Sequence, residues 1–259
     1  MNWQKLYKEY WQEGGIVMRL LILHTFAYLL IGLTSWVCAL ITPLRWWDLG
    51  LSLSFYPEWD KVLHHPWSLV TYALPHLNFF HFFGNMCLVY ALLPVMAYRL
   101  GTRRFLWSYI GGIIAGALTY LLGYQLLGAQ IIPPLSLQGA SAAILSVCAA
   151  AVMVDRKILS SFTLRFTGNR IPPIALWGFL FLVFLGAGRG NLGGHLAHLG
   201  GLLFGITCGL YYRKQAKRPT SVFTSDREEL LRKTRHSSFS SLSPEERRRL
   251  MKNLPKDKN

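Results

Sequence analysis

The sequence predicts an all-α membrane protein, a bundle of six transmembrane helices with an interfacial first loop and a polar cytosolic C-terminal tail. Of its 259 residues 52% are hydrophobic and 15% are charged, whereas soluble domains carry about 25% charged residues. The hydrophobic residues also form uninterrupted blocks near the roughly 20 residues that a helix needs to cross a bilayer. The predicted order is an N-terminal cytosolic segment (1–15), a membrane domain (16–213) and a basic cytosolic tail (214–259). These observations exclude an ordinary soluble domain.

Six hydrophobic blocks are candidate spans. The predicted spans are Leu20 to Thr42, His76 to Tyr98, Phe105 to Leu127, Gly139 to Val154, Pro173 to Gly188 and His195 to Tyr212. The fourth and fifth are short, which indicates helices that begin below one membrane surface or pack inside the bundle. The first block is too long for a signal peptide and no small-residue cleavage site follows it, so we expect it to be retained.

Positive charge sets the predicted orientation. The loops after spans two, four and six contain Arg99, Arg103, Arg104, Arg156, Lys157, Arg165, Arg170, Arg213, Lys214, Lys217 and Arg218. Because cytoplasmic loops carry an excess of Lys and Arg, both termini are predicted to lie in the cytoplasm. Residues 213–259 hold 14 Lys and Arg against 6 Asp and Glu, which is a large part of the +15 net charge. A basic tail beside lipid headgroups accounts for this charge, and we expect no nucleic-acid partner.

Two segments outside the spans have their own patterns. Pro43 to Pro66 combines Trp, Leu and Phe with few charges, which is typical of an interfacial amphipathic segment. Within it, anchoring at the interface accounts for Trp46 and Trp47. In the tail, the run from Ser243 to Glu246 predicts a short polar helix with Ser243 as N-cap and Glu246 at the third helical position.

No cofactor, metal site or disulfide is expected. The four cysteines lie in apolar stretches, where they pack as small hydrophobic residues. His195 and His198 have a spacing that could ligate a metal, with His64, His65 and His76 as conceivable further ligands. No HExxH sequence is present, and spans two, four and six contain no acidic residue apart from Asp155 at the inner end of span four, so a metal site is not predicted.

Polar residues at membrane depth are costly and indicate function when a partner is available. His81 and Asn85 in span two are four residues apart and therefore share one helix face. They could act together in chemistry, or they could form an interhelical hydrogen-bond pair that holds the bundle.

Ser141 opens the fourth span within the run Gly139-Ala-Ser-Ala-Ala143. A serine among small residues often marks close helix packing. In the first turn of a helix, however, its backbone N–H has no intrahelical acceptor, and such a donor can stabilise an oxyanion.

His198 precedes Gly201 and Gly205, a GxxxG pattern that lets another helix approach closely. Small residues of span four are the expected partner: Ala142, Ala143 and Ala149. This contact would bring the hydroxyl of Ser141 within hydrogen-bond reach of the imidazole of His198, as a nucleophile with its base. His195 is interpreted as a packing or capping group, and His24 in span one has no evident partner.

These features together resemble the rhomboid intramembrane serine proteases, over residues of about 16 to 213. The resemblance rests on six spans, on His81xxxAsn85, on Gly139-Ala-Ser141-Ala142, and on Ala197-His198-Leu-Gly-Gly201-xxx-Gly205. The approach Pro66-Trp-Ser-Leu-Val-Thr-Tyr72 to His76 is also similar. The tail sequence that ends at Glu246 resembles the tails of some bacterial members.

The resemblance implies site roles. Ser141 would be the nucleophile and His198 the general base and then acid, in a Ser-His dyad without a carboxylate. His81 and Asn85, with the Ser141 N–H, would stabilise the oxyanion. The chain departs from the family at Ala142, where members commonly have Gly, and its methyl could crowd the oxyanion pocket or tighten the packing. It also lacks the Trp-Arg pair of the first loop, because Ser68 follows Trp67.

The predicted function is therefore a serine-type intramembrane endopeptidase whose partners are transmembrane protein substrates and the lipid bilayer. The resemblance implies a multi-pass protein of the bacterial cytoplasmic (inner) membrane. The alternative is a catalytically impaired relative that binds membrane clients without cleaving them. A small proton-relaying transporter is disfavoured, because no acidic residue lies in mid-membrane and no pair of broken helices is present.

Overall fold

The computed structural model describes residues 15–41, 49–76, 78–156, 158, 164–166, 169–171, 191–217, 243 and 245–246. The chain forms two compact units, Met1–Tyr211 and Tyr212–Asn259. The predicted fifth span, Pro173 to Gly188, lies outside the described residues, as do the first 14 residues and most of the tail.

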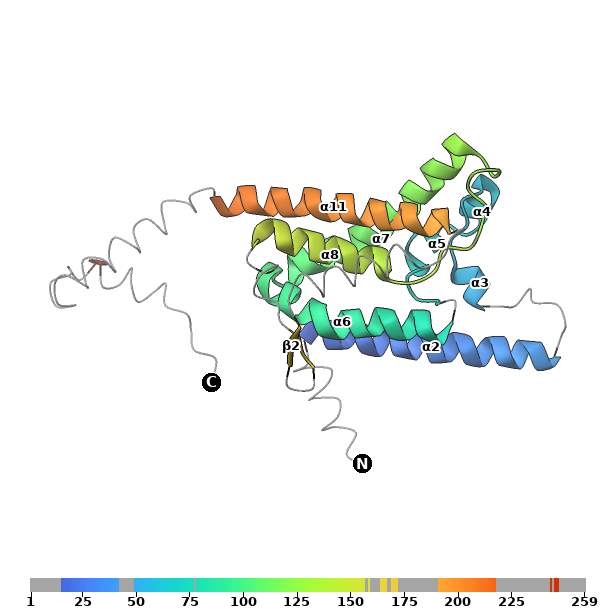
Figure 1. Cartoon of the computed structure of the whole chain (residues 1–259), viewed down its shortest axis with the longest axis horizontal. Coiled ribbons are helices and arrows are strands. Elements are labelled where there is room, and N and C mark those ends of the chain that lie inside the picture. The colour runs from blue at the N-terminus through green and yellow to red at the C-terminus, as the bar shows by residue number, and fades with distance from the viewer. Residues whose placement is uncertain are drawn as a thin grey trace, which may run out of the picture. The chain divides into compact units, whose positions relative to one another are not determined.

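Five long helices make up most of the described chain (Figure 1). They are α2 (Gly15–Ile41), α6 (Phe79–Leu100), α7 (Thr102–Leu127), α8 (Ser141–Val154) and α11 (Leu192–Lys217). Three short helices lie between α2 and α6: α3 (Leu49–Leu53), α4 (Trp59–His64) and α5 (Ser68–Thr71). Strands β1 (Leu164–Phe166) and β2 (Asn169–Ile171) pair antiparallel.

Three of these helices, α2, α6 and α7, are long and apolar enough to cross a membrane. They correspond to the first three predicted spans. Helix α8 is apolar but has 14 residues, so it is about 21 Å long at 1.5 Å per residue, shorter than the hydrocarbon core. Helix α11 has 26 residues, among which several glycines and two histidines dilute the apolar ones.

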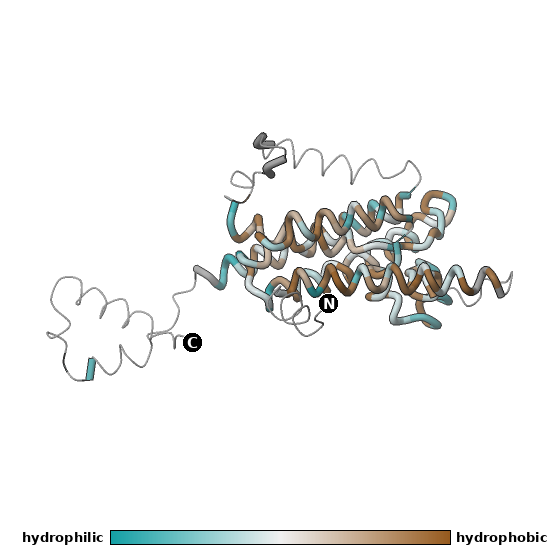
Figure 2. The backbone as a smooth tube through the Cα atoms, turned by 90° about the horizontal axis from the view of Figure 1, so that it is seen from below, coloured by the Kyte–Doolittle hydropathy of each residue, from teal (hydrophilic) through white to brown (hydrophobic). Residues whose placement is uncertain are grey.

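The exposed and buried faces of the helices fit a membrane-embedded bundle. Helix α2 exposes large apolar side chains along its length, with Phe26, Leu29 and Trp36 each more than 60% exposed. Helix α8 has the opposite character, because Ala143, Val147 and other small side chains along it are completely buried. Hydrophobic residues follow most of the length of the helices (Figure 2). The protein is therefore an integral membrane protein in which α8 lies inside the bundle.

Glycines of α11 provide the contact with α8. A Cβ added at Gly201 would overlap the carbonyl oxygen of Ala142, and one at Gly205 would overlap the carbonyl oxygen of Ser146. The predicted packing of these two helices is confirmed, with Ala142 at the contact. Ser146 and Ala150 are the next residues of α8 against glycines of α11, because two closely packed helices meet at about every fourth residue.

The C-terminal ends of α6 and α8 meet in an ion pair. Nη1 of Arg99 lies 3.1 Å from Oδ2 of Asp155. The two helices therefore run in the same direction, and their N-terminal ends, which carry His81 and Ser141, lie together at the other end of the bundle.

In the second unit, the predicted capping of the tail helix is confirmed. The backbone N–H of Ser243 donates to Oε2 of Glu246 at 2.9 Å, and the N–H of Glu246 donates to Oγ of Ser243 at 3.2 Å. This reciprocal pair satisfies two N–H groups that have no acceptor within a helix.

Substitution of Gly205 by alanine tests the α8–α11 contact. The added methyl has only rigid backbone of Ser146 to displace, so we expect the free energy of unfolding to fall by about 1–3 kcal/mol, as in other overpacked cores. Thermal unfolding in detergent measures this loss. The matched control is Gly32→Ala on α2, where an added Cβ has no atom within 4 Å; equal melting temperatures for the two variants would contradict the packing.

Candidate active site

Ser141 is the first residue of α8. Ala140 precedes it as N-cap, and no side chain caps this end of the helix. The N–H of Ser141 has no intrahelical acceptor at this position, and the helix dipole makes the surroundings favourable to negative charge. The N-terminus of α8 therefore offers a hydroxyl and a backbone donor side by side.

The segment before Ser141 is held in place by the first loop. Phe55 and Leu137 exchange two backbone hydrogen bonds, and the N–H of Gly139 donates to the carbonyl oxygen of Tyr72 at 2.9 Å. Gly139 has a φ of 101°, a conformation that side-chain-bearing residues rarely adopt. The glycine thus turns the chain into α8 and fixes the direction of Ser141.

The first loop is itself anchored without the Trp-Arg pair. Nε1 of Trp67 donates to the carbonyl oxygen of Ser52 at 3.1 Å, and Oγ1 of Thr71 donates to that of Leu53 at 2.9 Å. Ser68, in the place of the arginine, is buried. These bonds tie α5 to α3, so the missing pair does not leave this part of the loop without attachment.

Ser141 and His198 are in direct contact. Oγ of Ser141 lies 2.7 Å from Nε2 of His198, although the two residues are 57 positions apart. His198 stands near the start of α11, whose N-terminus is capped by Asn191: its Oδ1 accepts from the N–H of Gly194 at 2.8 Å. Gly201, one turn beyond His198, brings α11 against the first turn of α8.

His81 and Asn85 lie on α6, close to the N-terminus of α8. A Cβ added at Gly139 would lie 2.8 Å from Nε2 of His81, so the imidazole packs against the backbone two residues before Ser141. Nδ2 of Asn85 donates to the carbonyl oxygen of His81 at 2.9 Å, which leaves its second N–H for another acceptor. Asn78 caps α6 by accepting from the N–H of His81 at 2.9 Å.

Two further histidines stand behind His81. The ring centres of His76 and His81 are 5.1 Å apart, and those of His24 and His76 are 6.1 Å apart. The expectation that His24 has no evident partner is wrong. Its Nε2 forms a hydrogen bond of 2.8 Å with the hydroxyl of Tyr109 on α7. In the sequence, His24 and Tyr109 are polar residues in two separate apolar spans. Nothing in the sequence shows that these two spans are neighbours.

The ring of His76 makes a hydrogen bond to the chain through one of its two nitrogens. Its Nδ1 lies 3.0 Å from the carbonyl oxygen of Leu74 and therefore carries the proton, so Nε2 is an acceptor.

The methyl of Ala142 faces α7. A Cβ added at Gly116 of α7 would lie 2.9 Å from Cβ of Ala142, and Ala142 is 2% exposed. The methyl thus fills space between α8 and α7. The sequence left open whether Ala142, in place of the family's glycine, crowds the oxyanion pocket or tightens the packing. This geometry favours tighter packing.

Two other described histidines, His195 and His64, lie at the edge of this arrangement or apart from it. His195 is one turn before His198, with ring centres 6.3 Å apart. His64 bonds within α4, to the carbonyl oxygen of Asp60. Within the described residues no group of three His, Cys, Asp or Glu side chains could hold a metal ion.

Comparison with known families agrees with this geometry. A family model described as Rhomboid domain matches residues 63–215, more than half of the chain. The chain belongs to the rhomboid family. Among curated proteins, none matches the chain significantly. The matched part of this rhomboid-family chain contains α5 to α8, most of α11 and all four candidate site residues, whereas α2 precedes it.

Replacement of Gly139 by alanine tests how the rhomboid domain positions Ser141. The variant combines the strain of a positive φ with overlap of the His81 ring, so we expect it to lower the melting temperature more than strain alone, which costs about 1–3 kcal/mol. The control is Gly128→Ala, which has a similar φ of 79° and no atom within 4 Å of the added Cβ. If both variants unfold at the same temperature in detergent, the ring of His81 does not lie against Gly139.

Proposed function

We propose that this rhomboid-family protein is an intramembrane serine endopeptidase that uses Ser141 and His198 as a catalytic dyad. The observation that carries the proposal is the 2.7 Å contact between Oγ of Ser141 and Nε2 of His198. A serine hydroxyl is a weak nucleophile until a base at hydrogen-bond distance removes its proton. Family membership supports the same chemistry.

In the acylation step, Oγ of Ser141 attacks the carbonyl carbon of a substrate peptide while Nε2 of His198 accepts the hydroxyl proton. The tetrahedral intermediate then collapses, the C–N bond breaks, and His198 returns the proton to the leaving amine. A carboxylate partner is not required for this sequence.

The oxyanion of the intermediate is stabilised by donors on two helices. The Ser141 N–H at the start of α8 is one donor, and the free N–H of the Asn85 amide is a second. Nε2 of His81, which faces Gly139, is a third donor when its proton resides on that atom. Removing one such donor lowers kcat by about 10²- to 10³-fold in other serine proteases.

The substrates are transmembrane helices cut near their outer ends. Helix α8 has 14 residues, too few to cross the hydrocarbon core, which supports a start below the membrane surface and a dyad at the depth of a substrate's transmembrane segment. We assign the protein to the bacterial cytoplasmic membrane with six spans and cytoplasmic termini. The Arg99–Asp155 pair at the opposite end of the bundle from Ser141 supports the expected direction of α6 and α8.

Alanine variants of the dyad test the proposal. We expect the purified protein in liposomes to cleave a fluorogenic transmembrane peptide and to react with a fluorophosphonate at Ser141. Ser141→Ala and His198→Ala should each lower kcat by at least about 10³-fold, because the dyad acts as a unit. The controls are Ser146→Ala, five residues along α8, and His195→Ala, three residues before His198. Wild type that neither cleaves nor labels would favour the client-binding relative.

Ala142→Gly tests the effect of the unusual methyl. Because this methyl packs against Gly116 of α7, we expect the labelling rate of Ser141 to change by less than about threefold, below 1 kcal/mol. The loss of buried packing should instead lower the melting temperature. Much faster labelling of the glycine variant would show that the methyl obstructs the oxyanion pocket.

A further inference from the structure

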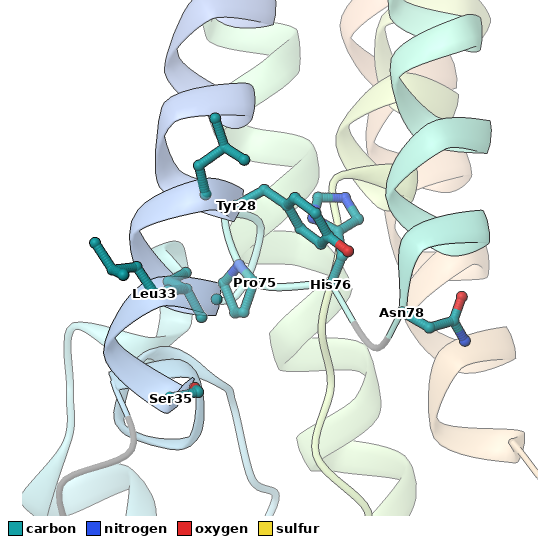
Figure 3. Close-up of a pocket in the computed structure, with 9 residues that line it drawn as sticks. Tyr28, Leu33, Ser35, Pro75, His76 and Asn78 are labelled. Atoms are coloured by element: carbon teal, nitrogen blue, oxygen red, sulfur yellow. The ribbon is translucent and has the colours of Figure 1, made fainter. Parts of the chain in front are cut away.

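A pocket of about 400 Å³ opens between α2 and the segment that leads into α6. It lies between Tyr28 to Ser35 of α2 and the residues Pro75, His76 and Asn78, and we call it the α2 pocket. Figure 3 shows it between α2, which carries Tyr28, Leu33 and Ser35, and the segment with Pro75 and His76. This volume holds roughly a dozen waters at about 30 Å³ each.

His76 connects this pocket to the candidate active site. Its ring lines the α2 pocket and stands 5.1 Å, centre to centre, from the ring of His81, which packs against Gly139. Tyr28 and His76 both pack on Phe82, with ring centres 4.1 Å and 5.5 Å away. His76 therefore lies between the α2 pocket and His81, and His81 lies against the backbone that leads into α8.

His24, His76 and His81 each have a ring nitrogen without a protein partner. Nδ1 of His24, Nε2 of His76 and Nδ1 of His81 are buried and make no hydrogen bond to the chain. Buried polar atoms in native proteins are bonded to ordered water when they have no protein partner. These atoms lie on three neighbouring rings, from α2, the segment before α6 and α6 itself, and unpaired polar nitrogens favour ordered water over an apolar ligand.

We propose that the α2 pocket is a water inlet and that His24, His76 and His81 hold the waters that supply hydrolysis at Ser141. This inference rests on the proposed protease function. In deacylation, the water oxygen attacks the acyl carbonyl carbon and its proton passes to Nε2 of His198. The ester C–O bond then breaks, and His198 returns the proton to Oγ of Ser141, which releases a carboxylic acid product. His24 and His76 are positioning residues, since they act through water.

The same waters give His81 its orientation. Nε2 of His76 is an acceptor, because Nδ1 of that ring carries the proton. A water can donate one hydrogen to Nε2 of His76 and the other to Nδ1 of His81. With Nδ1 of His81 accepting, the proton of that ring stays on Nε2, the atom that faces Gly139. The water site thus fixes the tautomer that donates to the oxyanion.

Gly32→Leu closes the inlet without touching the site. An added Cβ at Gly32 has no atom within 4 Å and lies in the wall of the α2 pocket, so the side chain enters open space. Leu30→Phe is the matched control, because it adds bulk two residues, about 200°, around the same helix. Gly32→Ala, with a single methyl, is the intermediate variant.

The decisive measurement separates acylation from deacylation. Wild type and variants are acylated with a 4-nitrophenyl ester, and decay of the acyl-enzyme is followed by intact mass spectrometry. We expect Gly32→Leu to lengthen the acyl-enzyme half-life by about tenfold, equivalent to 1.36 kcal/mol, with fluorophosphonate labelling unchanged. Leu30→Phe should behave as wild type. Equal acyl-enzyme half-lives in all variants would overturn the proposed inlet. A raised KM of Gly32→Leu for the transmembrane peptide, with normal deacylation, would also overturn it and would make the pocket a substrate or lipid site.

A second measurement does not depend on activity. Radiolytic hydroxyl-radical footprinting reports water next to a side chain, and we expect His76 to be oxidised in wild type and protected at least about threefold in Gly32→Leu, as water beside it is excluded. The proposal is contradicted if His76 is oxidised equally in wild type and Gly32→Leu, or if it is oxidised in neither protein. If the protein does not label at Ser141 but shows this footprint, the protease function fails while the hydrated pocket stands.

Discussion

The structure depends on the close approach of α11 to α8. Where Gly201 and Gly205 face Ala142 and Ser146, no side chain separates the two backbones. Lipid tails are as apolar as the protein surface, so such dense packing, rather than a hydrophobic driving force, holds membrane helices together. The same contact sets the height of one helix against the other. It therefore determines that His198 meets Ser141, and any larger residue at these glycines would move the base away from the hydroxyl.

Around this contact, the candidate active site is assembled from helix ends. Ser141 begins α8, His81 is in the first turn of α6 and His198 is in the second turn of α11. Helix N-termini supply unpaired N–H groups and a favourable field for negative charge, which a protease needs at its oxyanion. The parallel direction of α6 and α8, supported by the Arg99–Asp155 pair at their far ends, places these N-termini together.

Helix α2 has two faces with different tasks. One face exposes large apolar side chains, as expected for contact with lipid. The other carries His24, which joins α7 through Tyr109 and stands beside His76. This helix lies outside the matched Rhomboid domain, so its histidine and its pocket are features that the family comparison does not describe.

The sequence by itself determined the helical membrane class, the first three spans, the GxxxG contact and the candidate residues Ser141, His198, His81 and Asn85. These follow from local properties: length of apolar runs, spacing along one helix, and the cost of polar groups in lipid. Only the tertiary structure decided that Oγ of Ser141 lies 2.7 Å from His198, that the Ala142 methyl points at Gly116, and that His24 bonds to Tyr109. These facts join residues up to 85 positions apart. They depend on which helices are neighbours and how each is rotated, and helical spacing within one segment carries no information on either.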